Sequence, residues 1–320
     1  MNLKQLVDIA KNKTNFATLP DYLTFCLHYI DFITTGLQAE IVAQNETDYR
    51  FFQYDESGHF NITRPINSKL FIRADQIDVI EGEFVKTLKG ARDIAPTDAT
   101  RRAILNNGVY TIQQAIGAAL DALPAGESNT ARKIAGDLFE RLVRLLIREL
   151  DITCVAGTVQ VPVIVDGQEL FKMAYQHDML IKDGEELKVI GSVKTSSKDR
   201  IDKIFLDKFL YCKLTDTAIP HIAVFLNDVQ RKPARRPNQY SINSTFLSGH
   251  FKGFTVKLNP LDGVYYCDIR PNMIADPLLS EQIDTLDRLF CNDLWSFLEK
   301  PGIAAETEPK GELGDSEVES

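Results

Sequence analysis

This chain of 320 residues is most constrained by a regular succession of helix and strand patterns between residues 130 and 226. Apolar residues recur at helical spacing at the start of this region, and strand-like apolar runs separated by turn signals follow. The pattern predicts a helix at 134–150, strands at 159–165, 170–182 and 187–194, a helix at 200–214 and a strand at 221–226. This order predicts an α/β fold in which helices flank a mixed central sheet.

The rest of the sequence lies on either side of this core. Residues 1–125 predict a mixed, largely helical accessory region, and residues 126–300 predict the core itself. The other predicted elements are helices at 3–10, 22–37 and 111–123, a hairpin of strands at 254–258 and 264–269, and a closing helix at 280–298. Residues 301–320 lack aromatic residues and are rich in Glu, Gly and Pro, so they predict a disordered acidic tail.

Composition excludes several classes of protein. No run approaches the ~20 apolar residues that a membrane-spanning helix needs, so no membrane association is expected. The N-terminus has no signal-peptide pattern. The five cysteines are scattered and form no CxxC pair, which argues against a disulfide framework or a zinc site. We therefore expect a cytoplasmic protein.

The net charge of −9 weakens an expectation of DNA binding without excluding it. Residues 301–320 carry six acids against Lys310, a net charge of −5, which leaves about −4 for the other 300 residues. A nuclease also needs a carboxylate cluster for its metal, so its site is acidic before the metal binds. The distribution of charge therefore matters more than the sum.

The segment 175–200 carries the residues that suggest chemistry. Asp178 lies on one predicted strand, and Ser192 and Lys194 share a face of the next. Because the two strands form a predicted hairpin, Asp178 can lie beside Lys194. Hydrolysis of a phosphodiester needs a carboxylate that holds Mg²⁺ against the phosphate, and a lysine that positions the attacking water or offsets charge.

This layout resembles the PD-(D/E)xK nucleases over roughly residues 136–226. The resemblance implies a restriction-endonuclease-like core, a Mg²⁺ cofactor and double-stranded DNA as substrate. Two positions depart from the family pattern. His177 stands where proline is usual, and Ser192 stands where the second acid is usual. The second departure is the serious one, because serine is a poor Mg²⁺ ligand.

The departure at Ser192 is similar to the SxK subgroup of type II restriction endonucleases, which includes NgoMIV, SsoII, PspGI and EcoRII. In NgoMIV and SsoII the missing acid comes from the next helix, a dozen or so residues after the lysine. Asp207 stands thirteen residues after Lys194. Glu140 fits a GxxFE pattern in the preceding helix, which in this class often directs an acid at the metal. The resemblance thus implies Asp178, Asp207 and Glu140 as metal ligands.

Two basic segments are candidates for DNA contact. In the subgroup, a basic-acidic-Arg triplet soon after the lysine reads adjacent G·C pairs, and Lys198, Asp199 and Arg200 match it. Arg or Lys donates to guanine and Asp accepts from cytosine. A later cluster, Arg231, Lys232, Arg235 and Arg236, predicts either a loop on the DNA or a solvated loop.

Each of these motifs alone has an ordinary interpretation. Ser192 and Lys194 could belong to a solvated edge strand, Asp207 to a helix surface, and Glu140 to an i,i+4 pair with Arg144. Their order along the chain favours a type II restriction endonuclease that cuts both strands of a short G/C-containing palindrome as a homodimer or homotetramer. The alternatives are a nonspecific or repair nuclease of the same superfamily and a catalytically decayed DNA-binding module, which Ser192 would favour.

Overall fold

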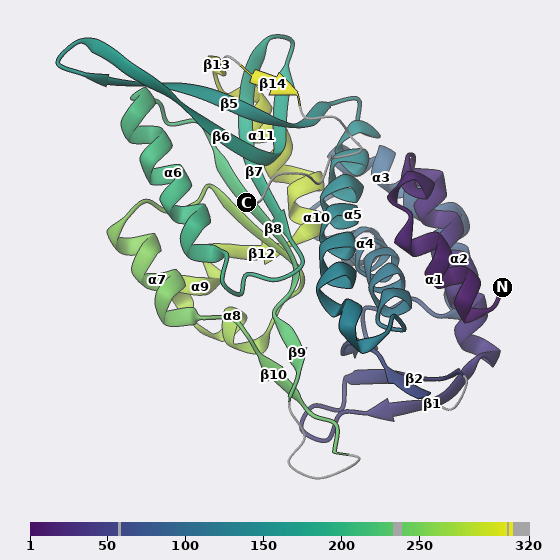
Figure 1. Ribbon diagram of the computed structural model, residues 1–320. Coiled ribbons are helices and arrows are strands. Elements are labelled where there is room, and N and C mark those ends of the chain that lie inside the picture. The colour runs from purple at the N-terminus through teal and green to yellow at the C-terminus, as the bar shows by residue number, and fades with distance from the viewer. Residues whose placement is uncertain (57–58, 233–238, 306, 310–320) are drawn as a thin grey trace.

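The computed structural model describes residues 1–56, 59–232, 239–305 and 307–309. It confirms the predicted α/β class: a central mixed sheet has helices on both faces (Figure 1). No helix among these residues is long and apolar enough to cross a membrane.

The N-terminal region packs helices beside a small antiparallel sheet. Its main elements are α1 (Leu3–Lys11), α2 (Leu19–Thr35), β1 (Leu37–Val42), β2 (Tyr49–Glu56), β3 (His59–Ile62), β4 (Ile66–Asn67), α3 (Phe84–Lys89) and α4 (Ala99–Leu120). Helix α2 begins with a capping box in which Thr18 and Asp21 satisfy each other's backbone donors. Helix α4 begins twelve residues before the predicted helix at 111–123. Asp98 caps its first turn, and Leu105 and Val109 in the added first half are buried.

The sheet region follows the predicted order. Its elements are α5 (Ser128–Arg148), β5 (Thr153–Val165), β6 (Gln168–Asp183), β7 (Glu186–Lys194), α6 (Ile201–Thr215), β8 (His221–Asn227), β9 (Val229–Arg231), β10 (Ile242–Ser244), α7 (Ser248–Lys257), β11 (Gly263–Asp268), α8 (Pro271–Ala275), α9 (Pro277–Ser280), β12 (Ile283–Thr285), α10 (Leu286–Arg288), α11 (Leu294–Glu299), β13 (Ile303–Ala304) and β14 (Thr307–Pro309).

The large sheet has the strand order β12-β11-β8-β7-β6-β5-β14, with β13 added beside β7. The pairs β7–β8, β8–β11 and β11–β12 are parallel. The pairs β5–β6 and β6–β7 are antiparallel. The carboxyl ends of β7, β8 and β11 therefore meet at one edge of the sheet. Beyond the sheet, β5 and β6 continue as a long two-stranded arm (Figure 1).

Alternation along β8 explains how both faces are covered. Ile222, Val224 and Leu226 belong to the core shared with α4 and α5, whereas Ala223 and Phe225 pack toward α6 and α7. The strand is buried along its whole length, as expected for a parallel strand between two helical layers. One continuous core thus joins the N-terminal helices to one face of the sheet.

The predicted hairpin of 254–258 and 264–269 is wrong. The first segment belongs to helix α7, and β11 pairs in parallel with β8. Parallel neighbours need a crossover rather than a tight turn, and α7 lies in that crossover. Phe251 and Phe254 of α7 pack on Phe205 with ring centroids 5.5 and 5.6 Å apart.

The two predictions for the end of the chain are also corrected in part. The closing helix begins at Leu286 rather than at 280, because Ile283–Thr285 pairs with β11 at the sheet edge. Within the predicted disordered tail, Ile303–Ala304 pairs with β7, and Thr307–Pro309 pairs with β5. Residues 306 and 310–320 lie outside the described part of the chain.

The packing of α5 generates a stability prediction. Leu138 is fully buried, so Leu138→Ala should lower the free energy of unfolding by about 2–5 kcal/mol in a urea titration, because a cavity remains. The matched control is Leu206→Ala on α6, where the side chain is 53% exposed and the loss should stay under about 0.5 kcal/mol. Equal losses for both variants would contradict the burial of this α5 face.

Candidate active site

Asp178 lies where β6 separates from β7. The β6–β7 ladder runs from Asp183 paired with Glu186 to Met179 paired with Gly191, and the β5–β6 register shifts at the same level. Beyond the ladder, the Asp178 carboxylate accepts a hydrogen bond from the Val193 N–H at 2.9 Å. A register shift beside a functional group commonly redirects a side chain, and here the carboxylate takes the place of a backbone acceptor.

Lys194 joins two carboxylates from different elements. Its Nζ lies 2.7 Å from Asp178 Oδ2 and 2.7 Å from Glu140 Oε1. Helix α5 presents Glu140 from across the sheet edge, so residues 54 positions apart in the sequence contact each other. The structure therefore places three of the predicted site residues in one cluster.

Arg144 holds the backbone of this cluster at Asp178. It stands one turn after Glu140 on α5, and its guanidinium donates to the Asp178 backbone oxygen at 2.7 Å. Burial lowers the pKa of Arg144, although the carboxylates of Glu140 and Asp178 act in the opposite direction. The ordinary i,i+4 interpretation of Glu140 is thus replaced by a geometry in which Glu140 binds Lys194 and Arg144 holds the backbone of Asp178.

The electrostatics of the cluster follow from burial and from two neighbouring negative charges. Burial and the Asp178 carboxylate raise the pKa of Glu140 to about 7. Burial alone would lower the pKa of Lys194, but Asp178 and Glu140 outweigh it and raise that pKa above its ordinary value. Two carboxylates this close need a cation between them, which the lysine provides.

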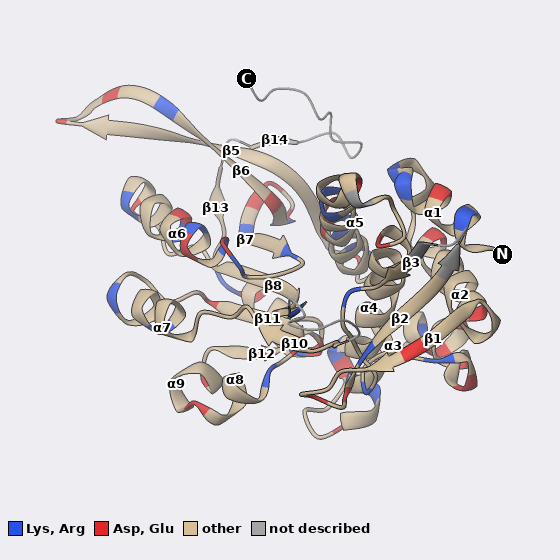
Figure 2. Ribbon diagram, turned by 60° about the horizontal axis from the view of Figure 1, so that its bottom comes forward, with Lys and Arg blue, Asp and Glu red and all other residues tan. Residues whose placement is uncertain are grey.

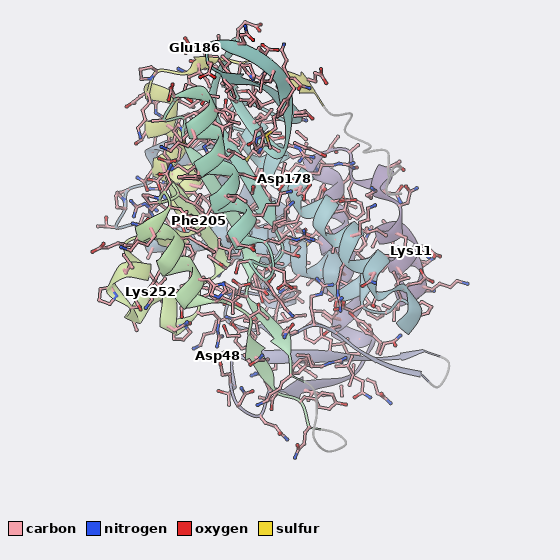
Figure 3. The ribbon with its side chains drawn as sticks, turned by 60° about the vertical axis from the view of Figure 1, so that its left-hand side comes forward. Lys11, Asp48, Asp178, Glu186, Phe205 and Lys252 are labelled. Carbon is pink, nitrogen blue, oxygen red and sulfur yellow. The ribbon has the colours of Figure 1, made fainter. Side chains whose placement is uncertain are left out.

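The cluster opens into a cleft of about 520 Å³ between α5, the ends of β6 and β7, and α6. In Figure 3, Asp178 lies between the green layer that contains Phe205 and the blue-to-purple layer that contains Lys11. The lining residues are Asn129, Arg132, Lys133, Gly136, Asp137, Glu140, Gln176, Asp178, Ser192, Lys194, Thr195, Ser196, Lys198, Arg200, Lys203, Ile204 and Asp207.

Asp207 and Ser192 line the same cleft but stand outside the lysine cluster. Burial raises the pKa of Asp207, and Asp178 contributes to that rise, so the two carboxylates are within electrostatic range. In the part of the chain that the structure describes, no three His, Cys, Asp or Glu side chains form a ready-made metal-binding group. The structure thus brings Asp178, Glu140 and Lys194 together and leaves Asp207 on the facing wall.

The predicted DNA-contact residues fall into three groups. Lys198 and Arg200 line the cleft, while Asp199 between them is exposed with a left-handed φ of 57°. Arg231 and Lys232 are exposed at the end of β9 and are not part of the cleft lining. The remaining members of that basic cluster, Arg235 and Arg236, lie outside the described residues.

Sequence reasoning missed several cations of the cleft. Arg132 and Lys133 line it from α5, and Lys203 lines it from α6. A signal was available on α5, where polar residues recur at helical spacing opposite the apolar stripe. The residues of this polar face of α5 are Asn129, Arg132, Lys133, Gly136, Asp137 and Glu140. Figure 2 shows acidic and basic residues interspersed over the whole ribbon. The basic residues of the cleft are therefore found from local clustering along a helix, and the net charge does not indicate them.

The fold can be compared with solved structures. Neither a protein-family model nor a curated protein matches the sequence. The structure is similar to the crystal structure of the type IIP restriction endonuclease Kpn2I, with a TM-score of 0.67 and 18% identity over 94% of this chain and 99% of Kpn2I. The chain has the restriction-endonuclease fold. A complex of the restriction endonuclease PspGI with substrate DNA aligns with a TM-score of 0.40 and 12% identity, over 69% of this chain and 90% of PspGI.

The donor set of this site suits Mg²⁺. Asp178 and Glu140 both reach the Lys194 ammonium, so their oxygens are within reach of one point. Mg²⁺ is commonly bound through one or two carboxylates, with water and substrate phosphate completing its shell. Asp178 and Glu140 would hold the ion, and Asp207 faces them across the cleft.

The raised pKa of Glu140 predicts pH-dependent metal binding. A proton on Glu140 competes with the cation, so affinity for Mg²⁺ should fall as pH decreases through about 7. The fall should approach about tenfold per pH unit on the acid side. Calorimetric titrations between about pH 6 and pH 8 measure it.

Glu140→Gln is the control for this titration. It should bind Mg²⁺ more weakly at every pH and should lose the step near pH 7, because the titrating group is gone. A wild-type affinity that stays constant over this range would show that Glu140 is not a ligand.

Proposed function

We propose that this protein is a type II restriction endonuclease that hydrolyses phosphodiester bonds in both strands of a short, G/C-containing palindrome with Mg²⁺. The observation that carries the proposal is the contact of Lys194 Nζ with both Asp178 and Glu140 in a cleft whose lining has more basic than acidic side chains. The restriction-endonuclease fold supports it.

Each residue of the cluster has a role that its position allows. A bound Mg²⁺ supplies Lewis-acid stabilisation of the scissile phosphate and lowers the pKa of water. Asp178 and Glu140 would bind the ion, and Arg144 fixes the backbone from which Asp178 projects. Lys194 would hold the attacking water or offset charge on the phosphate as negative charge develops. Ser192 lines the cleft on the same strand as Lys194, at the position where most members of the resembled family carry an acid.

The sequence specificity would come from the segment that follows β7. Lys198 and Arg200 line the cleft, where the Arg200 guanidinium could donate to guanine in bidentate geometry. Asp199 would accept from cytosine. Arg132, Lys133 and Lys203 would bind phosphates on both sides of the metal site. Because a palindrome is symmetric, a homodimer or homotetramer would present two such sites.

One experiment tests the whole proposal. A mixed-sequence plasmid is incubated with the full chain and Mg²⁺, and the fragment ends are sequenced. Cuts at one short symmetric sequence support a type II restriction endonuclease. Scattered cuts would point to a nonspecific nuclease, and intact plasmid would point to a decayed DNA-binding module.

Asp178→Ala should abolish cleavage and leave specific DNA binding equal to wild type or tighter. The substitution removes a metal ligand and also removes repulsion between the carboxylate and the phosphate. Cleavage rate and binding affinity are measured on the same labelled duplex. Near wild-type cleavage by this variant would rule out the assigned site.

Asp207→Ala tests whether the facing carboxylate contributes a ligand. The rate should fall by at least about 100-fold, because ligand geometry at the metal is lost. Asp202→Ala is the matched control on the same helix, since Asp202 is exposed and does not line the cleft; it should cut at the wild-type rate. If both variants cut normally, Asp178 and Glu140 hold the ion without Asp207.

Arg200→Ala should weaken specific binding by about 1–3 kcal/mol, the cost of one lost bidentate base contact, and should change nonspecific binding far less. Titrations with specific and unrelated duplexes over a range of salt concentrations measure both. An equal loss for the two duplexes, together with a shallower salt dependence, would make Arg200 a phosphate contact instead.

A further inference from the structure

Asp228, just after β8, has a carboxylate that is completely buried. It accepts hydrogen bonds from neutral donors on three different segments. The donors are Ser196 Oγ at 2.7 Å, Ser197 N at 2.9 Å, Ser197 Oγ at 2.5 Å, Thr245 Oγ1 at 3.1 Å and Tyr266 OH at 2.7 Å. No part of Asp228 lines the cleft, so its carboxylate cannot touch DNA there.

These bonds fix the start of the segment that carries Lys198 and Arg200. Ser196 Oγ accepts from the Lys198 N–H at 3.2 Å, and the Ser197 carbonyl accepts from the Arg200 N–H at 3.0 Å. The same Ser197 carbonyl accepts from the N–H of Ile201, the first residue of α6. The backbone N–H of Lys198 and that of Arg200 therefore each donate to a serine that is itself hydrogen-bonded to Asp228.

The energetics favour a dedicated role for this carboxylate. Burying an ionised carboxylate is costly unless hydrogen bonds replace its water, and several short bonds do so here. Removing a donor leaves the charge less satisfied, and removing a donor on Ser196 or Ser197 also frees a segment whose position must be accurate to bind base edges. A displacement of about 1 Å in such a site can cost on the order of a hundredfold.

We propose that Asp228 is a positioning residue for DNA sequence discrimination: through Ser196 and Ser197 it sets where Lys198 and Arg200 meet the bases. This inference rests on the proposed function. It adds a determinant of specificity that lies outside the metal site and outside the base-reading triplet.

The test compares two hydroxyl deletions around one carboxylate oxygen. Ser197 Oγ and Tyr266 OH both donate to Asp228 Oδ2, at 2.5 and 2.7 Å, and both residues are buried. Only Ser197 belongs to the segment that leads to the triplet. Ser197→Ala should therefore loosen that segment, whereas Tyr266→Phe removes an equivalent bond to Asp228, together with a contact to the Ser197 hydroxyl, and leaves both bonds from Ser197 to Asp228 in place.

The readout is the discrimination ratio: kcat/KM on the site that wild type cuts, divided by kcat/KM on a duplex with one base pair changed. The site that wild type cuts is first identified by sequencing plasmid digests, and each variant is then assayed on that site and on duplexes with one base pair changed. Ser197→Ala and Asp228→Asn should lower the ratio about 10- to 100-fold, chiefly by cutting the changed duplexes relatively faster. Tyr266→Phe should keep the wild-type ratio even if its melting temperature falls.

The outcomes separate this inference from the proposed function. Wild type that cuts no defined sequence overturns both. Wild type that cuts selectively, with an unchanged ratio in Ser197→Ala, overturns the role of Asp228 alone. An equal loss of discrimination in Tyr266→Phe would also overturn it, because general destabilisation would then explain the effect. Should Asp228→Asn fail to fold, Ser197→Ala and Tyr266→Phe still decide the question.

Discussion

The structure of the site depends on one electrostatic constraint: two carboxylates from different elements are held close together at the edge of a buried sheet. Asp178 is fixed by the Val193 N–H and by Arg144, and Glu140 is fixed by α5, so neither can move away freely. Burial, and then the repulsion from Asp178, raise the pKa of Glu140 to about 7. Such a pair needs a positive partner, and the Lys194 ammonium fills that need in the protein alone. The same need makes the place attractive to a divalent cation.

Helix α5 connects this constraint to the rest of the fold. Leu138 and Leu142 on one stripe anchor it in the core shared by the sheet and the N-terminal helices. Arg132 and Glu140 on the polar stripe face the cleft. A helix fixed on its apolar side can present a carboxylate with little freedom, which is what a metal site requires. The sheet contributes in the same way, because the parallel ends of β7 and β8 bring Lys194 and the start of the segment held by Asp228 to one edge.

Local sequence patterns predicted the elements of the site, while its geometry depended on contacts between distant segments. Asp183–Gly184, a turn signal between the strands predicted at 170–182 and 187–194, was sufficient to predict the β6–β7 hairpin. The register shift beside Asp178 has no sequence signal, and neither does the contact of Arg144 with the Asp178 carbonyl. Alternating apolar residues at 254–258 resembled a strand, but packing on Phe205 favours a helix in the crossover. Asp228 belongs to no motif, because its importance arises only from the serines that fold against it.

The charge of the molecule also has to be considered locally. A net charge of −9 disfavours nonspecific attraction to DNA at long range, where opposing charges are summed and screened. At the cleft the balance reverses, because its cations outnumber its acids. The cations are Arg132, Lys133, Lys194, Lys198, Arg200 and Lys203, and the acids are Asp137, Glu140, Asp178 and Asp207. Asp137 is also paired with Lys13 at 2.9 Å, and a divalent cation would neutralise the carboxylates at the centre. For the proposed nuclease this arrangement favours close, geometry-dependent binding over loose attraction, as a sequence-selective enzyme requires.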